Sequence, residues 1–297
     1  MCSSDLFDTA FLFSKAIKLV NKNAKDENKT ELKTVSLQFF PEGGYIIEGV
    51  RNTIAFKANY HNGLPFTVNG LIKKQETGEV VMELKSLHDG MGRFDLDIQP
   101  GEKFYAEWTD DKGATQQTYL PKARAEGVSL KLVLQKDKLI YNIINKLPGD
   151  SLHVLMYMYQ KVFYKTNLLV PATEPYTGIV PTGTLPTGTM QLTVFNASWQ
   201  PVAERIAFVN NDNYTLKTTI SNKEINTQKR GKNIIEIEVA DTIAANLSLS
   251  ITDAELNNEQ TNSTIVTNLL LSGDVKGYIH NPAYYFTDNA GDRKSVV

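Results

Sequence analysis

Short runs of alternating apolar and polar residues, each closed by a turn signal, recur along most of this chain. Leu247, Leu249 and Ile251, for example, alternate with serine and threonine, and residues 35–40 show a related pattern. Side chains of a strand point alternately to opposite faces, so a period of two predicts half-buried β-strands. No window sustains a capped apolar face at helical spacing over three turns. The sequence therefore predicts an all-β protein.

Turn signals divide these strands at short intervals. Asn62-Gly63 tolerates positive φ at both central positions and predicts a hairpin. Residues 41–44 combine Pro with paired Gly and are predicted to form a turn between strands at residues 35–40 and 45–50. Strands at this spacing are typical of antiparallel sandwiches or barrels, and a sandwich takes roughly 100 residues. A chain of 297 residues has room for two or three of them.

We expect the sandwiches to follow one another along the chain. Residues 35–125 are predicted to form the first, residues 126–210 the second, and residues 211–286 a third that is either complete or cut short. The third should contain strands at residues 214–220, 233–239, 246–252 and 268–271. Residues 7–34 are interpreted as the last strand of a preceding domain and a linker rich in Lys, Asn and Glu.

Both chain ends carry a hexapeptide that we interpret as an artefact. Residues 1–6 and 292–297 match in-frame translations of common short-read sequencing adapters. A match at one end would carry little weight, but matches at both ends favour this interpretation. We therefore expect the remaining residues to be an internal fragment of a longer gene, and the nucleotide sequence would test this expectation.

Charge and composition argue against several functional classes. The 31 Lys and Arg against 33 Asp and Glu give a net charge of -2, whereas a nucleic-acid binder usually has a basic excess. No apolar run approaches the roughly 20 residues of a transmembrane helix. The single cysteine, Cys2, lies in the first hexapeptide, so we expect neither an internal disulfide nor a zinc site built on thiolates.

The four histidines show no metal-ligand pattern. His61, His88, His153 and His280 have no second His at ligand spacing, and no H-E-x-x-H motif is present. His61 and His88 lie beside turn residues and His153 lies within a predicted strand. For these histidines we favour a packed or solvent-exposed role.

Motifs for nucleophilic, phosphate or acid–base chemistry are also missing. There is no G-x-S-x-G elbow, and the glycines of residues 183–188 lack the Lys that a phosphate loop requires. Asp95 and Asp97 share the solvent face of a predicted strand, and residues 110–113 form a turn. Neither supplies the opposed carboxylates of a glycosidase or the oxygen ligands of a calcium loop. We therefore expect no enzyme activity and no catalytic, cofactor-binding or metal-binding residues.

One group of aromatic residues leaves two interpretations open. Tyr157, Tyr159, Phe163 and Tyr164 lie close together in the sequence. They could form an exposed patch for a carbohydrate or a protein partner, or they could pack inside the fold. Packing is favoured, because sandwich cores use aromatic side chains routinely.

Three segments carry a resemblance to a known family. Residues 37–49 read Leu-Gln-Phe-Phe-Pro-Glu-Gly-Gly-Tyr-Ile-Ile-Glu-Gly, residues 204–209 read Glu-Arg-Ile-Ala-Phe-Val, and residues 273–286 include Gly-Asp-Val-Lys-Gly-Tyr-Ile and Asn-Pro-Ala-Tyr-Tyr-Phe. In this order they resemble the macroglobulin-like domains of bacterial alpha-2-macroglobulin relatives, in particular large cell-envelope proteins of Gram-negative bacteria. The resemblance implies tandem immunoglobulin- or macroglobulin-like antiparallel β-sandwiches.

The same resemblance implies a function outside catalysis. It suggests a scaffold or interaction region of a larger cell-envelope protein, in the periplasm or outer membrane, exported by a signal that the fragment does not contain. Such relatives often carry a carboxypeptidase-regulatory-like domain, whose pattern residues 89–105 also resemble, and a TonB-dependent-receptor plug domain. Expected partners are other proteins or neighbouring domains of the same chain.

Two alternative functions remain. One is a ligand-binding part of a TonB-dependent outer-membrane import system, with a glycan or peptide bound in a pocket under residues 171–188, which are rich in Gly, Pro and Thr and are predicted to form a loop. The other is a macroglobulin-type peptidase inhibitor. The Cys-Gly-Glu-Gln thioester and a bait region are not visible in the sequence, so protease trapping is not carried over from the resemblance.

Overall fold

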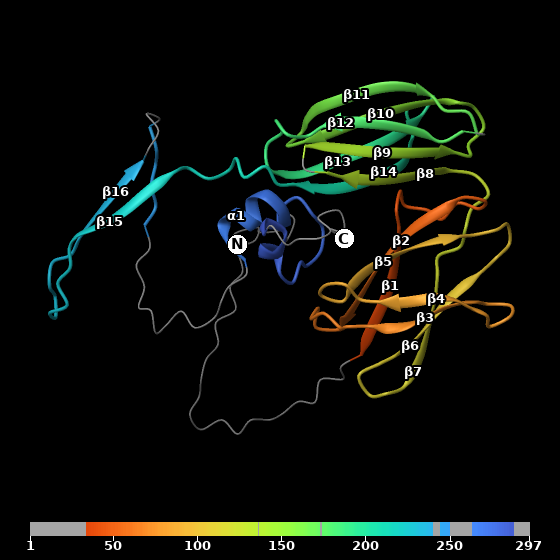
Figure 1. The fold of residues 1–297 in the computed structure, drawn as a ribbon, viewed down its shortest axis with the longest axis horizontal. Helices are drawn as coiled ribbons and strands as arrows, with labels where there is room; N and C mark the ends of the chain where they lie inside the picture. Colours follow the sequence, from red (N-terminus) through yellow and green to blue (C-terminus); the bar gives the residue numbers. More distant parts are fainter. Residues whose placement is uncertain (1–33, 136, 173, 240–243, 250–262, 288–297) are drawn as a thin grey trace, which may run out of the picture. The chain divides into compact units, whose positions relative to one another are not determined.

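The computed structural model describes residues 34–135, 137–172, 174–239, 244–249 and 263–287. Strands dominate these residues (Figure 1). The interpretations of residues 1–33 and 292–297 concern parts of the chain outside the described residues. No helix in the described residues is long and apolar enough to cross a membrane.

The first sandwich is built from two antiparallel sheets. One sheet has the order β1-β2-β5 and the other the order β4-β3-β6-β7. Ile54, Phe56 and Leu96 of the first sheet share one buried core with Phe104 and Trp108 of the second. The strands are β1 (Val35–Pro41), β2 (Arg51–Tyr60), β3 (Asn69–Lys74), β4 (Val80–Lys85), β5 (Met91–Asp97), β6 (Phe104–Thr109) and β7 (Thr115–Tyr119).

The second sandwich has its own core. Its sheets have the orders β12-β9-β8 and β11-β10-β13-β14. In β10 the residues Leu152, Val154 and Met156 are buried and alternate with half-buried outward residues, as the period of two predicts. The strands are β8 (Val128–Leu134), β9 (Lys138–Asn145), β10 (Ser151–Met158), β11 (Lys161–Leu169), β12 (Tyr176–Pro181), β13 (Gly188–Asn196) and β14 (Pro201–Val209).

The two sandwiches share one topology. Adding seven to each strand number of the first converts its sheet orders into those of the second. In both, the first, second and fifth strands form one sheet, and the other four form the second. This is an immunoglobulin-like arrangement of two facing antiparallel sheets. The predicted all-β class with tandem sandwiches is confirmed.

Residues 45–50 were expected to be a strand, and this prediction is wrong. They form turns with a single bridge at Ile47. The Asn52 side chain explains the difference, because its Oδ1 accepts from Ile47 N at 2.8 Å and its Nδ2 donates to the carbonyls of Ile47 and Val50. These bonds satisfy backbone groups that a strand would pair with a neighbour.

The predicted loop over residues 171–188 contains strand β12, which pairs with β9. Its Gly, Pro and Thr residues are typical of loops, so the local sequence did not indicate a strand. Strand β12 is at the edge of its sheet, where Pro181 is tolerated. Gly178 of this strand is buried under the Tyr141 ring. A Cβ atom at residue 178 would lie 2.0 Å from Tyr141 Cζ, so glycine is required here by close packing.

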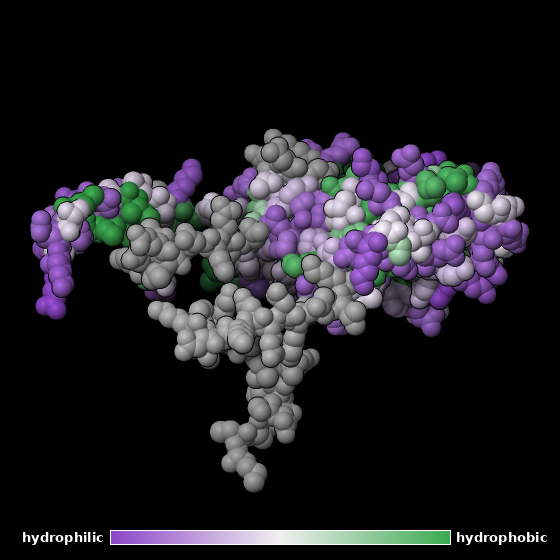
Figure 2. All heavy atoms as spheres, turned by 90° about the horizontal axis from the view of Figure 1, so that it is seen from below, coloured by the Kyte–Doolittle hydropathy of each residue, from purple (hydrophilic) through white to green (hydrophobic). Residues whose placement is uncertain are grey.

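The region of the predicted third sandwich is only partly described. Strands β15 (Thr218–Glu224) and β16 (Ile234–Val239) pair as a two-stranded sheet with exposed apolar side chains (Figure 2). The prediction of a strand at residues 246–252 is wrong for its described part, because residues 244–249 form no strand. Because residues 240–243 and 250–262 lie outside the description, a third sandwich stays a prediction.

The prediction of a strand at residues 268–271 is wrong. A helical turn, α1 (Ile265–Thr267), continues into a wider turn, η4 (Asn268–Ser272). Thr264 and Thr267 form a reciprocal capping box that starts the helical path. The run Leu269-Leu270-Leu271 also has no alternation, and Leu271 is fully buried.

Residues 263–287, which end in the short helix η5 (Pro282–Phe286), contact both sandwiches. Leu271 and Tyr285 pack with Phe208 of β14. On the first sandwich, Lys57 Nζ donates to the Tyr278 carbonyl at 3.1 Å, and the His88 ring stacks on Tyr284 at 3.6 Å. The segment therefore connects the second sandwich to the first.

The packing at Gly178 yields a stability prediction. Gly178→Ala should lower the free energy of unfolding by about 1–3 kcal/mol, because the added methyl group overlaps the buried Tyr141 ring. Gly183→Ala is the matched control, since its Cβ would meet nothing closer than 3.5 Å. Urea unfolding of both variants measures the difference, and equal losses would contradict the packing argument.

Candidate functional site

The junction between the two sandwiches begins at a tight turn of the first. Residues 41–44 lie against the second sandwich, between β8 and β14. A Cβ atom on Gly43 would lie 3.3 Å from Leu130 N and 3.6 Å from Ala203 Cβ, and Gly43 has a φ of +86°. The glycine thus permits both the left-handed backbone and the close approach.

A buried ion pair lies at the centre of this contact. Arg205 Nη2 is 2.8 Å from Glu42 Oε1, and the two side chains are 10% and 3% exposed. Arg205 is opposite buried Leu192 in the β13–β14 register, so it is on the core-facing side of its sheet. Its side chain extends from there to Glu42 of the first sandwich. Glu42 is held by its own backbone, which donates to the Thr53 carbonyl at 2.8 Å.

A second ionic contact joins the sandwiches at a more exposed place. Lys131 Nζ of β8 lies 3.2 Å from Asp95 Oδ2 of β5, and Thr53 Oγ1 donates to Asp95 Oδ1. Burial raises the pKa of Asp95, but the Thr53 and Lys131 hydrogen bonds and the charges of Lys131 and Arg51 outweigh it. The net pKa of Asp95 is below its usual value.

The linker between the two sandwiches, which includes Arg124, is hydrogen-bonded to the first sandwich. Arg124 N donates to the Ile46 carbonyl and Glu48 N to the Arg124 carbonyl, both at 2.9 Å, which makes a short parallel bridge. The Arg124 guanidinium lies 3.4 Å from the centre of the Tyr45 ring. Backbone and side chain both attach the linker, so it does not behave as a free tether.

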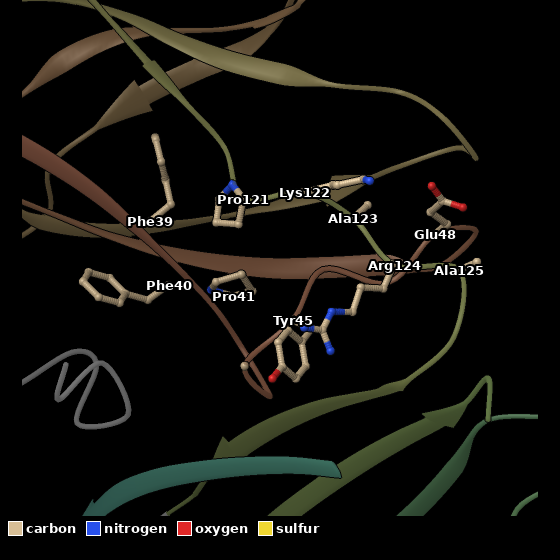
Figure 3. A pocket seen from close by; sticks show the side chains of 11 residues that line it. Phe39, Phe40, Pro41, Tyr45, Glu48, Pro121, Lys122, Ala123, Arg124 and Ala125 are labelled. Carbon is tan, nitrogen blue, oxygen red and sulfur yellow. The ribbon is translucent and has the colours of Figure 1, made fainter.

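A groove of about 950 Å³ lies beside this linker (Figure 3). The end of β1, Tyr45 and the linker residues line it, and its walls are mainly apolar. Lys122 and Arg124 add positive charge, while Glu48 accepts a hydrogen bond from Gly101 N at 3.1 Å. Glu48 is the one acid among its described lining residues, so the groove offers no pair of facing acids.

The four histidines that the sequence analysis considered do not form one group in the structure. His61 is exposed, and His88 lies under Tyr284 with its Nε2 3.0 Å from Asp89 Oδ2. His153 and His280 are both partly buried. No group of three His, Cys, Asp or Glu able to hold a metal occurs in the described residues.

The aromatic group at residues 157–164 is also divided. The Tyr164 hydroxyl turns inward and lies 3.0 Å from that of Tyr141. Tyr159 OH donates to the Thr187 carbonyl at 2.6 Å, yet Tyr159 and Phe163 are each 42% exposed. The favoured packing interpretation therefore fits Tyr164, which packs against the core of the second sandwich, but not Tyr159 or Phe163.

Other predicted positions have structural roles. Asp95 and Asp97 share one face as expected, and Asp97 is the more exposed of the two. Asp110 closes its turn by accepting from Lys112 N and Ala114 N at 2.9 Å. Residues 183–188 form a loop in which Asn213 accepts from Thr187 N.

Sequence reasoning did not identify the Glu42–Arg205 pair. Both residues belong to segments that carry the family resemblance, yet 163 positions separate them. The available signal was Arg205 at an inward position of a strand, because a buried charge requires a partner. The identity of that partner was not deducible from local pattern.

No family model and no curated protein matches the chain. Similar solved structures include the BSP domain of a biofilm-associated protein, 13% identical with a TM-score of 0.30, which aligns over 61% of this chain and 30% of that one. Escherichia coli alpha-2-macroglobulin is 10% identical with a TM-score of 0.23, over 64% and 23%. The bacterial integrin-binding protein invasin is 11% identical with a TM-score of 0.24, over 64% and 42%. Such scores assign no family, and the fold class rests on the strand pairing itself.

The buried ion pair yields a second prediction. Arg205→Met should destabilise the protein by about 3–5 kcal/mol, because it leaves Glu42 buried without its cation. Restoring an apolar pair with Arg205→Met plus Glu42→Leu should recover much of this loss. Urea unfolding measures both changes.

An exposed ion pair provides the matched control for Arg205. Lys223 pairs with Glu236 on the surface, so Lys223→Met should cost about 1 kcal/mol or less. If Arg205→Met and Lys223→Met cost the same, the junction pair does not have the role assigned to it.

The Asp95 contact predicts a dependence on pH. Its pKa is lowered in the folded protein, so its stabilising effect is present above the unfolded pKa of about 3.9 and is lost as pH falls through the lower folded value. Wild type should therefore exceed Asp95→Asn in unfolding free energy at neutral pH and lose that advantage in strong acid. A constant difference across this range would contradict the prediction, and Asp97→Asn serves as the exposed control.

Proposed function

We propose that this chain is a non-catalytic scaffold and interaction region of a larger bacterial cell-envelope protein. Its two sandwiches act as one stiff unit that sets the distance and direction between neighbouring parts of the longer chain. The buried Glu42–Arg205 pair is the observation that carries this proposal.

The energetics of the junction support stiffness. Domains joined by a flexible linker are expected to move relative to one another. Here separation would expose a pair whose side chains are 3% and 10% accessible, and would also break the contact between Lys131 and Asp95. Both contacts join the two sandwiches directly, so both oppose bending.

The titratable groups support a role without catalysis. Lys73 has a raised pKa because Glu107 accepts its hydrogen bond at 2.6 Å, and Lys74 has a raised pKa because of Glu102. These are ion pairs along strands, in which each base is matched by its own acid. Active sites instead gather perturbed groups around one cleft.

The envelope location rests on the family resemblance of residues 37–49, 204–209 and 273–286. It supports a place in the periplasm or outer membrane, within a protein that also carries a carboxypeptidase-regulatory-like or TonB-receptor plug domain. The partners would be these neighbouring domains and other envelope proteins. The groove beside the linker gives such a partner a surface at the junction itself.

A distance measurement tests the stiff-unit proposal. Cys2→Ser removes the only cysteine, and Glu76→Cys with Lys161→Cys places one spin label on an exposed position of each sandwich. Double electron–electron resonance should give one narrow distribution of the distance between the two labels, and Arg205→Met should broaden it. The same labels with Lys223→Met should leave it narrow. A broad distribution in the parent protein would overturn the proposal.

A further inference from the structure

A second surface of interest lies on the β11-β10-β13-β14 sheet, next to the turn between β13 and β14. Trp199 is in this turn and is 46% exposed. The other tryptophan of the chain, Trp108, is 4% exposed and belongs to the core of the first sandwich. Exposing one of two tryptophans leaves a large apolar ring in water, which calls for an explanation.

The backbone holds Trp199 in an unfavourable conformation. Its φ is +59°, in the left-handed region that bulky residues rarely adopt because it strains the backbone. Asn196 maintains it: its Oδ1 accepts from Ser198 N and Gln200 N at 3.0 Å, and its carbonyl accepts from Trp199 N at 2.9 Å. The ring is therefore positioned by a turn with several fixed bonds.

Neighbouring strands complete a platform beneath it. In the sheet register His153 is opposite Asn167 of β11 on one side and Phe195 of β13 on the other. The His153 ring stacks on Trp199 with centres 4.0 Å apart and planes 6° apart, and Phe195 lies 5.7 Å from Trp199. His153 Nδ1 is 2.8 Å from Asn167 Oδ1, which fixes the imidazole.

Hydrogen-bond donors and positive charge gather at this platform. Lys165 Nζ is 5.1 Å from the Trp199 ring centre and has no acidic partner in the described part of the chain. Across the four strands of the sheet, Lys165, Leu155, Thr193 and Glu204 are opposite one another in this order. Glu204, the acid in this row, is therefore at the far end from Lys165, and it accepts from Thr193 Oγ1 at 3.2 Å. The platform therefore favours a ligand that has an apolar face and a negative charge.

We propose that the Trp199 platform, defined as Trp199, His153, Phe195, Asn167 and Lys165, binds a glycan that contains uronic acid. A pyranose ring has a flat face of C–H groups that can lie on an indole, and its hydroxyl groups can accept from side-chain amides. The carboxylate of a uronic acid would pair with Lys165. This binding activity is separate from the scaffold role, because none of the platform residues belongs to the junction.

Oligogalacturonate and cellohexaose are suitable probes, one acidic and one neutral. Because Trp108 is buried, a change in tryptophan fluorescence on adding sugar reports on Trp199. Oligogalacturonate should give a saturable change, and calorimetry should show that Trp199→Ala weakens binding about tenfold or more. Lys165→Gln should weaken it severalfold and reduce its dependence on salt.

Controls separate binding from folding. Tyr119→Ala removes an aromatic ring that is 59% exposed on the first sandwich and should leave binding unchanged. Trp199→Phe retains a ring and should keep part of the affinity, and thermal unfolding confirms that each variant is folded. Failure of oligogalacturonate to bind, or binding that Trp199→Ala leaves intact, would overturn the proposal. Equal binding of cellohexaose or of an oligoglutamate peptide would overturn the assignment to an acidic glycan.

Discussion

Arg205 of the second sandwich and Glu42 of the first form one buried ion pair, and the arrangement of the two described sandwiches depends on it. A charge taken out of water is stabilised only while its partner stays in place. The pair is 2.8 Å long and nearly inaccessible, so it favours one relative position of the two sandwiches over all others. Gly43 permits this contact, because its missing Cβ allows the turn to reach Leu130 and Ala203.

The shared topology explains why the junction forms at this place. In the second sandwich, β8 and β14 are edge strands of opposite sheets, so the core is open between them. The turn at residues 41–44 covers this opening, and residues 263–287 cover Phe208 further along β14. Other parts of the same chain therefore contact both of these edge strands.

Sandwich architecture keeps stability and recognition on different residues. Inward residues such as Val154 and Leu192 build the core, whereas outward residues on the same strands, such as His153, are free of that task. The Trp199 turn lies at the end of the sheet, where a strained loop does not disturb the core. The two proposals together describe a stiff unit that holds a recognition surface at a set position, with the junction and the platform as its two parts.

Sequence alone determined the local order of this protein: it predicted the strand that contains His153 and the turn at Asn62-Gly63, because both depend on neighbouring residues. It misjudged residues 45–50, whose backbone bonds to the Asn52 side chain, and residues 171–188, where β12 pairs with β9. Its resemblance segments included Glu42 and Arg205 but not their pairing. Tertiary structure alone decided that pairing and the stacking of His153 on Trp199. The physical reason is that strand patterning is a property of one segment, whereas a buried charge or a stacked ring is defined by whichever distant side chain the fold places against it.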